Sequence, residues 1–398
     1  MRLWYIYLGG NDPGSSVQRK AVCQINELRH HGIDAQGIFF TPLVKENMDL
    51  SDHVRVIRVP DFVSNRKYFR NYYEAQAAYR FIQDYLNVHE SEFDFIFLRH
   101  GTTGSEYFKL LKAFGKKIFL YIPSNTIAEN FRERQAAPAN GFVGSCFRWW
   151  EYFRYFYIYE KRLIRSYLSK QSGVVVFTNE FAGILRRQAK GRVNFICNRD
   201  GADCEHVNPR SADPDRTGKV KLLFMKGSSM AQPWSGIDRL IESIAAGGKD
   251  RFELYITGKV VDESWKKYDF VKLTGRLSAE DLRTLTDQVD LGVSNLANYL
   301  IGFNETTNLK SREYFACGLP FIQANSMPDV DGTIAAQYYL NLPNDDSMID
   351  MDLVYEFAMK MRADRHHIQQ MRNFAEEHLD WRVTVGELSK MLKEQASA

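Results

Sequence analysis

The chain has 398 residues, about twice the length of an ordinary domain, and its 44% hydrophobic, 25% charged and 14% aromatic residues predict two folded domains rather than a disordered chain. The net charge of +3 is unevenly distributed: residues 1–201 hold 29 Lys and Arg against 19 Asp and Glu, and the remainder holds 23 against 30. The absence of a long apolar run and of a signal-peptide pattern predicts a cytoplasmic protein, and five scattered cysteines without a C-x-x-C pair exclude a disulfide framework and a zinc site.

Short apolar runs alternate with longer helical stretches throughout the chain, a pattern typical of β-α-β units and parallel sheets. In the first half, strands are expected over residues 3–8, 34–40, 54–59, 93–98, 117–122, 173–177 and 192–197. They predict a Rossmann-like first domain over residues 1–203.

Residues 204–218 are rich in turn formers and poor in apolar side chains, which predicts an interdomain linker. A second Rossmann-like domain is then expected over residues 219–380, with strands over residues 220–225, 252–257, 270–273, 291–294 and 320–323. A helical pattern over about residues 381–398 predicts a final helix that packs back on the first domain. The expected fold class is therefore α/β, with two Rossmann-like parallel-sheet domains.

Residues 302–322 form a polar loop, a helix that ends at Gly318 and an apolar strand. Thr307 or Asn308 is expected to be the N-cap of this helix. The exposed N–H groups of the first turn and the helix dipole would offer a site for a diphosphate, and Lys310 adds a cation in the same turn.

Glu305 lies in the loop before this helix and Glu313 lies in its second turn. Their spacing allows both carboxylates to face one site above the strand ends, and a carboxylate can accept hydrogen bonds from paired sugar hydroxyls. The alternative is a solvated amphipathic helix with incidental glutamates. The apolar continuation of the segment into a strand argues against this alternative.

Glu305-x7-Glu313 followed by Ala-Cys-Gly-Leu-Pro at residues 316–320 resembles the signature of the retaining GT-B glycosyltransferases of the family 4-like group 1. The resemblance implies two Rossmann-like domains that face each other across a cleft, with Glu313 on the nucleotide ribose and Glu305 near the donor sugar. It implies transfer from a nucleoside-diphosphate sugar to a saccharide or lipid-linked acceptor, with retention of configuration, in bacterial surface polysaccharide or glycolipid synthesis.

The resemblance extends through residues 233–240, 254–258 and 271–278. In relatives the last two segments border the nucleotide base, which makes Gly258 and Arg276 candidate residues on the base side.

One departure concerns the diphosphate. Where the family has an arginine and a lysine that grip this group, the chain has Ser228 and Ser235. Lys226 and the adjacent Gly227 are the expected substitutes, together with the cation in the helix. The departure leaves open a catalytically impaired GT-B binding or adaptor subunit. A GT-B nucleotide-sugar epimerase is a second, enzymatic alternative.

In the first half, the loop over residues 9–16 follows a strand and precedes a helix. Gly10 and Ser15 are candidates for contact with the donor phosphate or the acceptor, and an ordinary strand-to-helix turn is the alternative. His100 and Asn125 lie just past strand ends, where open α/β sheets bind ligands. His100 could orient a hydroxyl and Asn125 could bond to the sugar, although a lone histidine is more often structural.

D-x-D triplets, which bind metal-diphosphate in other transferases, occur at residues 213–215, 329–331 and 350–352. None lies at the helix N-terminus that is expected to hold the phosphate. We therefore predict no required metal and no cofactor apart from the nucleotide-sugar donor.

Residues 147–162 mix aromatic and cationic side chains at helical spacing. The aromatic residues are too many for one buried stripe, so an interfacial helix on an anionic membrane surface is expected, with Trp149 and Trp150 at the headgroups. The protein would then be peripheral on the inner face of the membrane. The alternative is a helix sandwiched between the first sheet and the C-terminal helix. No nucleic-acid partner is predicted.

Overall fold

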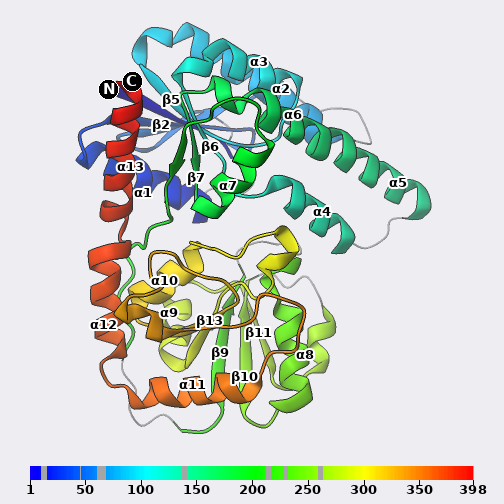
Figure 1. Ribbon diagram of the computed structural model, residues 1–398, viewed down its shortest axis with the longest axis vertical. Coiled ribbons are helices and arrows are strands. Elements are labelled where there is room, and N and C mark those ends of the chain that lie inside the picture. The colour runs from blue at the N-terminus through cyan, green and yellow to red at the C-terminus, as the bar shows by residue number, and fades with distance from the viewer. Residues whose placement is uncertain are drawn as a thin grey trace. The chain divides into compact units, whose positions relative to one another are not determined.

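The computed structural model describes residues 1–9, 16–44, 46–60, 69–136, 141–211, 217–226, 232–258 and 263–397, and the chain divides into two compact units (Figure 1). Unit 1 comprises Met1–Arg134, Pro138–Arg199 and Thr384–Ala398. Unit 2 comprises Gln135–Ala137 and Asp200–Val383.

Unit 1 is built on an eight-stranded sheet with the order β3-β4-β2-β1-β5-β6-β7-β8. The neighbouring strands are parallel except at the β3·β4 edge, which is antiparallel. The strands are β1 (Arg2–Leu8), β2 (Asp34–Thr41), β3 (Met48–Ser51), β4 (Val54–Arg58), β5 (Phe95–Arg99), β6 (Ile118–Tyr121), β7 (Gly173–Val176) and β8 (Phe195–Cys197). The central strands are continuous apolar runs because helices cover both of their faces.

The helices of unit 1 follow the strands in β-α order. They are α1 (Ser16–His30), α2 (Arg70–Val88), α3 (Ser105–Phe114), α4 (Thr126–Ala136), α5 (Gly141–Glu151), α6 (Tyr159–Ser166) and α7 (Asn179–Gln188), with short η1 (Glu90–Glu92), η2 (Gly115–Lys117) and η4 (Leu168–Lys170). A π-helical segment, η3 (Tyr152–Ile158), joins α5 to α6, so that residues 141–166 form one continuous helix. Helix α5 extends away from the sheet of unit 1 (Figure 1).

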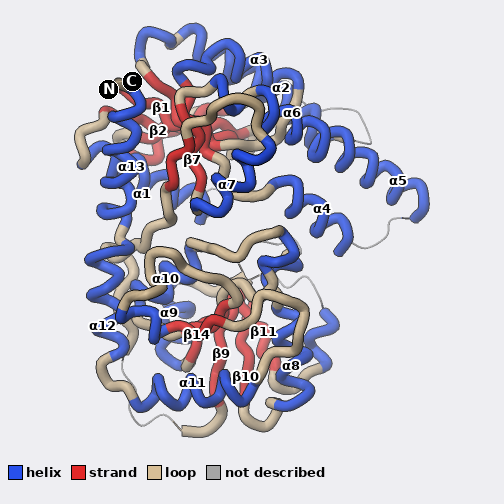
Figure 2. The backbone as a smooth tube through the Cα atoms, viewed as in Figure 1, coloured by secondary structure: helices blue, strands red, loops and turns tan. Residues whose placement is uncertain are grey.

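Unit 2 contains a six-stranded parallel sheet with the order β11-β10-β9-β12-β13-β14, flanked by helices (Figure 2). Its strands are β9 (Val220–Met225), β10 (Phe252–Thr257), β11 (Val271–Gly275), β12 (Leu291–Val293), β13 (Phe321–Gln323) and β14 (Tyr339–Asn341). Its helices are α8 (Ile237–Gly247), α9 (Ala279–Gln288), α10 (Leu309–Cys317), α11 (Met351–Ala363), α12 (His367–Phe374) and the start of α13 (Trp381–Ala396), with the short elements η5 (Pro233–Ser235), η6 (Glu263–Lys267), η7 (Asn298–Ile301), η8 (Ile334–Tyr338) and η9 (Ala375–Leu379).

Each sheet has a topological switch point, where successive strands stop being added on one side of the first strand and continue on its other side. In unit 2 the chain goes from β9 outward to β10 and β11, and returns to the other side of β9 with β12. In unit 1 the corresponding point lies between β1 and β5. Open α/β sheets bind ligands outside the carboxyl ends of the strands at such switch points. A site is therefore expected at the carboxyl ends of the strands beside each switch point.

The segment expected to be an interdomain linker begins inside unit 2. Cys204 is buried, and Ala202, just before it, bridges to Asp380. The guanidinium of Arg372 donates to the carbonyls of Cys204 and Val207, and also to the last turn of α10 at Ala316. A turn-rich polar segment can pack in a core when a buried cation satisfies its carbonyls. Residues 212–216 of the expected linker lie outside the described residues.

The C-terminal helix α13 starts in unit 2 and, from Thr384 onward, belongs to unit 1. Lys393 Nζ donates to the carbonyl of His31 at 2.6 Å, and Ser389 Oγ donates to the same oxygen at 3.4 Å. This carbonyl lies just past the end of α1, where a cation interacts favourably with the helix dipole. In the described parts of the chain, no helix is both long enough and apolar enough to cross a bilayer.

Candidate functional site

Helix α10 begins at the carboxyl end of β12, beside the switch point of unit 2. Of the two N-cap candidates, Asn308 is the N-cap: its Oδ1 accepts a hydrogen bond from Ser311 N at 3.0 Å. The N–H groups of Leu309 and Lys310 in the first turn therefore have no partner within the helix. With the positive end of the helix dipole, they form a site suited to an anion.

A buried polar network fixes this helix end to the strands. Ser311 Oγ lies 2.9 Å from Ser294 Oγ at the end of β12 and donates to Gln323 Oε1 of β13 at 3.0 Å. The amide of Asn308 donates to Ser294 Oγ at 2.9 Å. The first turn of α10 is thus held against two strand ends by groups that are satisfied within the protein, so its N–H groups are pre-organised for a ligand.

Close approach of α10 to the sheet depends on a glycine. A Cβ at Gly292 of β12 would lie 2.7 Å from the ring of Tyr314, which is buried and donates its hydroxyl to the carbonyls of Val293 and Leu223 at 3.0 and 3.2 Å. The ring therefore occupies the space of the missing side chain and ties α10 to both β12 and β9.

Two lysines crowd the carboxyl end of β9. Lys310 Nζ lies 4.4 Å from the ring centroid of Phe224, and Lys226 follows the same strand. Burial lowers the pKa of Lys310 to about 7; the charge of Lys226 adds to this shift and the carboxylate of Glu313 opposes it. Burial also lowers the pKa of Lys226. Two cations in this environment are stabilised when an anion binds between them.

The loop that carries Glu305 is held by backbone contacts. Glu305 forms an isolated parallel bridge with Ser326: Thr306 N donates to Ser326 O, and Ser326 N donates to Asn304 O, each at 2.9 Å. Asn344 Nδ2 donates to the carbonyl of Phe303 at 2.7 Å. The position of Glu305 is therefore set by its main chain, and its side chain is half-buried.

Glu313 is also half-buried, in the second turn of α10, and its charge acts on Lys310 in the turn before it. The second candidate N-cap residue, Thr307, has a different role, because it is buried and its hydroxyl accepts from Asp200 N at 3.4 Å. The structure thus brings Lys310, Lys226 and Glu313 together at one edge of the sheet.

The two base-side candidates lie at the same edge. Gly258 follows β10 with φ +90°, and a Cβ there would lie 2.3 Å from the carbonyl oxygen of Lys226. Gly258 N also donates to Gly275 O at 2.7 Å, so this glycine allows the ends of β9, β10 and β11 to approach one another. Arg276 follows β11 and is exposed.

Several expected residues lie outside the described residues or in a different environment. Gly10, Ser15, Gly227 and Ser228 lie outside the described residues. Ser235 is buried, and its carbonyl accepts from Leu296 N at 2.9 Å.

The expectation that His100 orients a ligand hydroxyl needs correction. The ring is 2% exposed, with Nδ1 3.0 Å from Tyr107 Oη and Nε2 3.1 Å from Glu160 Oε1. Both ring nitrogens are therefore engaged inside unit 1, and the role of His100 is structural. The residues next to His100 do not indicate this contact, because Glu160 is 60 residues further along the chain.

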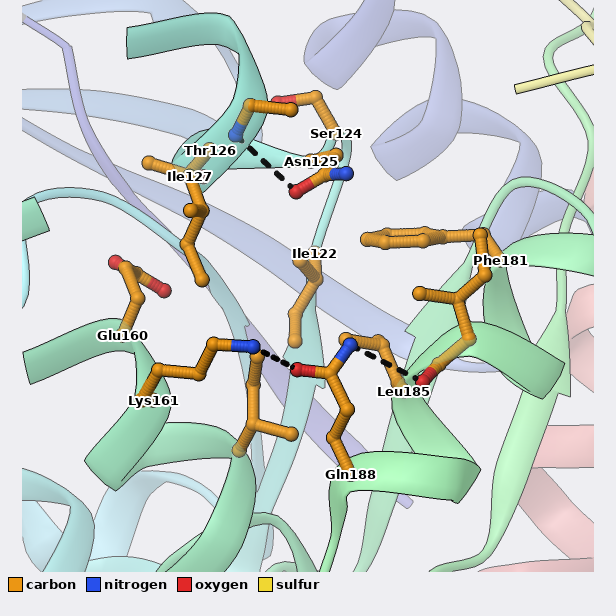
Figure 3. A pocket seen from close by; sticks show the side chains of 13 residues that line it. Ile122, Ser124, Asn125, Thr126, Ile127, Glu160, Lys161, Phe181, Leu185 and Gln188 are labelled. Carbon is orange, nitrogen blue, oxygen red and sulfur yellow. Dashed lines mark hydrogen bonds between the residues drawn. The ribbon is translucent and has the colours of Figure 1, made fainter. Parts of the chain in front are cut away.

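Asn125 lies at the start of α4, where its Oδ1 accepts from Ala128 N at 3.4 Å. It lines a pocket in unit 1 together with Glu160, Lys161 and Gln188 (Figure 3). The local sequence does not indicate the last three as ligand contacts, because Glu160 and Lys161 belong to the aromatic-cationic segment over residues 147–162.

The described D-x-D triplets have structural partners. Asp329 pairs with the buried Arg312, and Asp331 accepts from Ser326, Met327 N and Tyr339. In the third triplet, Asp350 caps α11 and Asp352 pairs with Arg251 at 2.6 Å. The triplet at residues 213–215 lies outside the described residues. Among the residues that the structure describes, no group of three His, Cys, Asp or Glu side chains is arranged to hold a metal ion.

The aromatic-cationic segment is largely exposed. In the described part of α5 no residue is buried, and in η3 only Tyr152 and Tyr155 are. The exposed fraction is 85% for Phe142, 49% for Trp150 and 55% for Phe153. A sandwiched helix would hide these rings, so this alternative does not describe α5.

Solved structures similar to this chain cover both units. Sucrose-phosphate synthase from Thermosynechococcus elongatus matches with a TM-score of 0.65 at 14% identity, over 99% of each chain. WaaG, a glycosyltransferase involved in lipopolysaccharide biosynthesis, matches with a TM-score of 0.61 at 14% identity, over 98% of this chain and 99% of that one. Anabaena HepE, solved in complex with UDP and glucose, matches with a TM-score of 0.58 at 12% identity, over 99% of this chain and 100% of its own. No family profile and no curated protein sequence matches the chain.

At these identities the similarity shows the fold alone. The chain has the GT-B fold, with two α/β units built on predominantly parallel sheets. The fold expected from the resemblance of residues 305–320 is therefore confirmed.

Proposed function

We propose that the chain is a retaining glycosyltransferase that moves a hexosyl group from a nucleoside-diphosphate sugar to a saccharide or lipid-linked acceptor in polysaccharide or glycolipid synthesis. The observation that carries the proposal is the convergence of the α10 N-terminus, Lys310, Lys226 and Glu313 at the switch point of unit 2. This is the place in the sheet where a nucleotide is expected to bind.

In this proposal each group has one task. The N–H groups of Leu309 and Lys310, with the ammonium groups of Lys310 and Lys226, bind the diphosphate. Glu313 accepts hydrogen bonds from the ribose hydroxyls, and Glu305 lies beside the donor sugar. The base side is assigned to Gly258 and Arg276, and Asn308 and Thr307 position the helix end.

The chemistry follows from charge. As the bond from the sugar to the diphosphate breaks, negative charge develops on the leaving phosphate, and the helix end and lysines stabilise it. The acceptor hydroxyl attacks from the face that the diphosphate leaves, so configuration is retained, and the departing phosphate takes the acceptor proton. The cations at α10 supply positive charge at the place where a divalent metal would act, which supports a metal-independent reaction.

Calorimetric titration with UDP-, GDP- and ADP-sugars tests donor binding. We expect one class of donor to bind, and Glu313→Ala to weaken its binding about 10- to 100-fold, because one or two hydrogen bonds to a charged group are lost. The matched control is Glu280→Ala, an exposed carboxylate at the start of α9. Unchanged affinity in Glu313→Ala would remove this residue from the nucleotide site.

The same donors in a turnover assay separate a transferase from the two alternatives, an adaptor subunit and an epimerase. Release of the nucleoside diphosphate that increases with an acceptor extract supports transfer. Binding without turnover in any extract would indicate an adaptor subunit. Conversion of the donor sugar without release of nucleotide would indicate an epimerase.

We also propose that α5 and η3 rest on an anionic membrane surface, which would make the protein peripheral. The exposed rings of Phe142, Trp150 and Phe153 provide the apolar contact. Arg154, whose guanidinium carbon lies 5.7 Å from the ring centroid of Trp150, and Arg148 provide positive charge beside them. This combination is suited to the headgroup region of a bilayer.

Vesicle sedimentation measures how strongly the protein binds to a membrane through this surface. The protein should sediment with vesicles that contain anionic lipid and much less with neutral vesicles. Replacing both Trp149 and Trp150 with serine should weaken the partition at least about 10-fold, because about 1 kcal/mol or more is lost with each ring. Ile334→Ser, which removes an even more exposed apolar side chain from unit 2, is the control. Equal partition of the double variant and the wild type would contradict the proposal.

A further inference from the structure

Unit 1 contains a pocket of about 150 Å³ that the donor site described above does not use. It lies beyond the carboxyl end of β6, between the first turn of α4 and the helices α6 and α7 (Figure 3). A cavity of this size accommodates one six-membered ring. The pocket is therefore large enough for a single ring and too small for a nucleotide.

The lining combines an apolar wall with polar groups. The wall includes Ile122, Phe181 and Leu185. On the polar side, Lys161 Nζ donates to Gln188 Oε1 at 2.5 Å, and Gln188 Nε2 donates to the carbonyl of Ile184 at 3.4 Å. Figure 3 shows this pair on α6 and α7, with Asn125 at the start of α4. A few oriented polar groups on an apolar background are typical of small-molecule sites.

Glu160 is the most informative residue of the lining. Its side chain is only 5% exposed, and one carboxylate oxygen is engaged with His100 Nε2 at 3.1 Å. The second oxygen, Oε2, has no hydrogen-bond partner among the residues that the structure describes. Glu160 lines the pocket, and a hydrogen bond from a ligand to a carboxylate in such a sheltered place is stronger than one between neutral groups, so a ligand that donates here would be favoured.

These features select one class of ligand. A carboxylate beside the pocket disfavours a second phosphate, and the polar groups disfavour a bare acyl chain. A sugar ring has hydroxyl donors for Glu160, hydroxyl acceptors for Lys161, and C–H faces for the apolar wall. We propose that this pocket binds one monosaccharide unit of the acceptor, with Glu160 accepting a hydrogen bond from a ring hydroxyl.

This inference rests on the proposed glycosyl transfer and adds to it the chemical class of the acceptor end. The structural contact from the buried His100 holds the Glu160 carboxylate in place. The sequence signal that pointed to Asn125 as a sugar contact applies to this pocket, which Asn125 lines.

The test uses the full chain and a panel of free monosaccharides, with and without UDP, monitored by saturation-transfer NMR and titration. At least one sugar should bind, and its affinity should fall about 10-fold or more in Glu160→Gln, which keeps the shape but loses the charge. Ile184→Trp fills the pocket and should abolish binding. Glu46→Gln, an exposed carboxylate of unit 1, should bind as the wild type does.

Two results would overturn the pocket: sugar binding that both pocket variants leave unchanged, or no sugar bound by protein that binds a nucleotide sugar. Thermal melts identify a variant that fails to fold, and Ile184→Trp keeps the test valid if Glu160→Gln is the one that fails. Donor titration of the unmodified protein reports on the proposed function separately. Sugar binding without donor binding would support the pocket and contradict the transferase.

Discussion

A Lys310→Met protein should bind its nucleotide sugar about 100-fold more weakly than the wild type at pH 7, because it loses a charge-assisted contact with the diphosphate. The same protein should unfold at a higher temperature when no ligand is present. Lys310 is held beside Lys226 and over the ring of Phe224, an environment that disfavours its charge. Methionine fills similar space without the free-energy penalty of a buried charge. Each 1 kcal/mol gained in the free energy of unfolding should raise Tm by about 2–4 °C.

The pH dependence of stability has a definite sign. The pKa of Lys310 is about 7 in the folded protein, against 10.5 for the unperturbed group. Between these values the unfolded chain binds more protons than the folded one, so the contribution of this group to stability rises with pH across this window. The rise should be absent in Lys310→Met and present in Lys360→Met, an exposed lysine of α11.

The affinity for a nucleotide sugar should show the opposite trend. A bound diphosphate raises the pKa of Lys310, so binding takes up a proton when the free lysine is neutral. Affinity should therefore be highest below pH 7 and fall above it, by at most about 10-fold per pH unit. Titrations between pH 6 and 9 measure this trend. A profile shared by the wild type and Lys310→Met would show that this lysine does not contact the diphosphate.

Glu305→Gln should lower turnover about 10²- to 10³-fold and change the donor dissociation constant by less than about 3-fold. The magnitude is that of removing one oriented electrostatic group from an active site. In the proposed function the carboxylate lies beside the donor sugar, whose ring would gain positive charge as the diphosphate departs. Because the bridge between Glu305 and Ser326 is made by the main chain, the substitution should leave the loop intact.

Single-turnover release of the nucleoside diphosphate, combined with donor titration, separates the two effects. Glu280→Gln is the matched control, since it removes an exposed negative charge from unit 2. If donor affinity fell as far as turnover, Glu305 would be a ground-state binding residue. If neither changed, the assignment of Glu305 to the donor sugar would be wrong.

The predicted strands are all present because their signal is local: runs of buried apolar residues between turn formers. The two strands that the sequence did not predict are β3 and β14. In β3, Met48–Ser51 has three exposed residues and pairs only at the edge of the sheet. β14 has three residues and begins directly after η8. Neither shows an apolar run or alternation.

Where the sequence was ambiguous, the deciding contacts are distant along the chain. Thr307 and Asn308 can both cap a helix, and Thr307 is excluded by burial beside Asp200, 107 residues away. The role of His100 depends on Glu160, and the start of unit 2 depends on Arg372. Composition and spacing contain no information on these pairings.

The continuous helix formed by α5, η3 and α6 sets the distance between the exposed aromatic surface and the pocket. It carries the exposed Trp150 and, ten residues further on, Glu160 in the wall of the pocket. At the α-helical rise of about 1.5 Å per residue, which the π-helical η3 does not reach, these points are separated by at most roughly 15 Å along the helix axis. If the aromatic surface binds the bilayer and the pocket binds the sugar, the helix sets the distance between the two. An acceptor whose lipid stays in the membrane then needs a head group of about this length to reach the pocket.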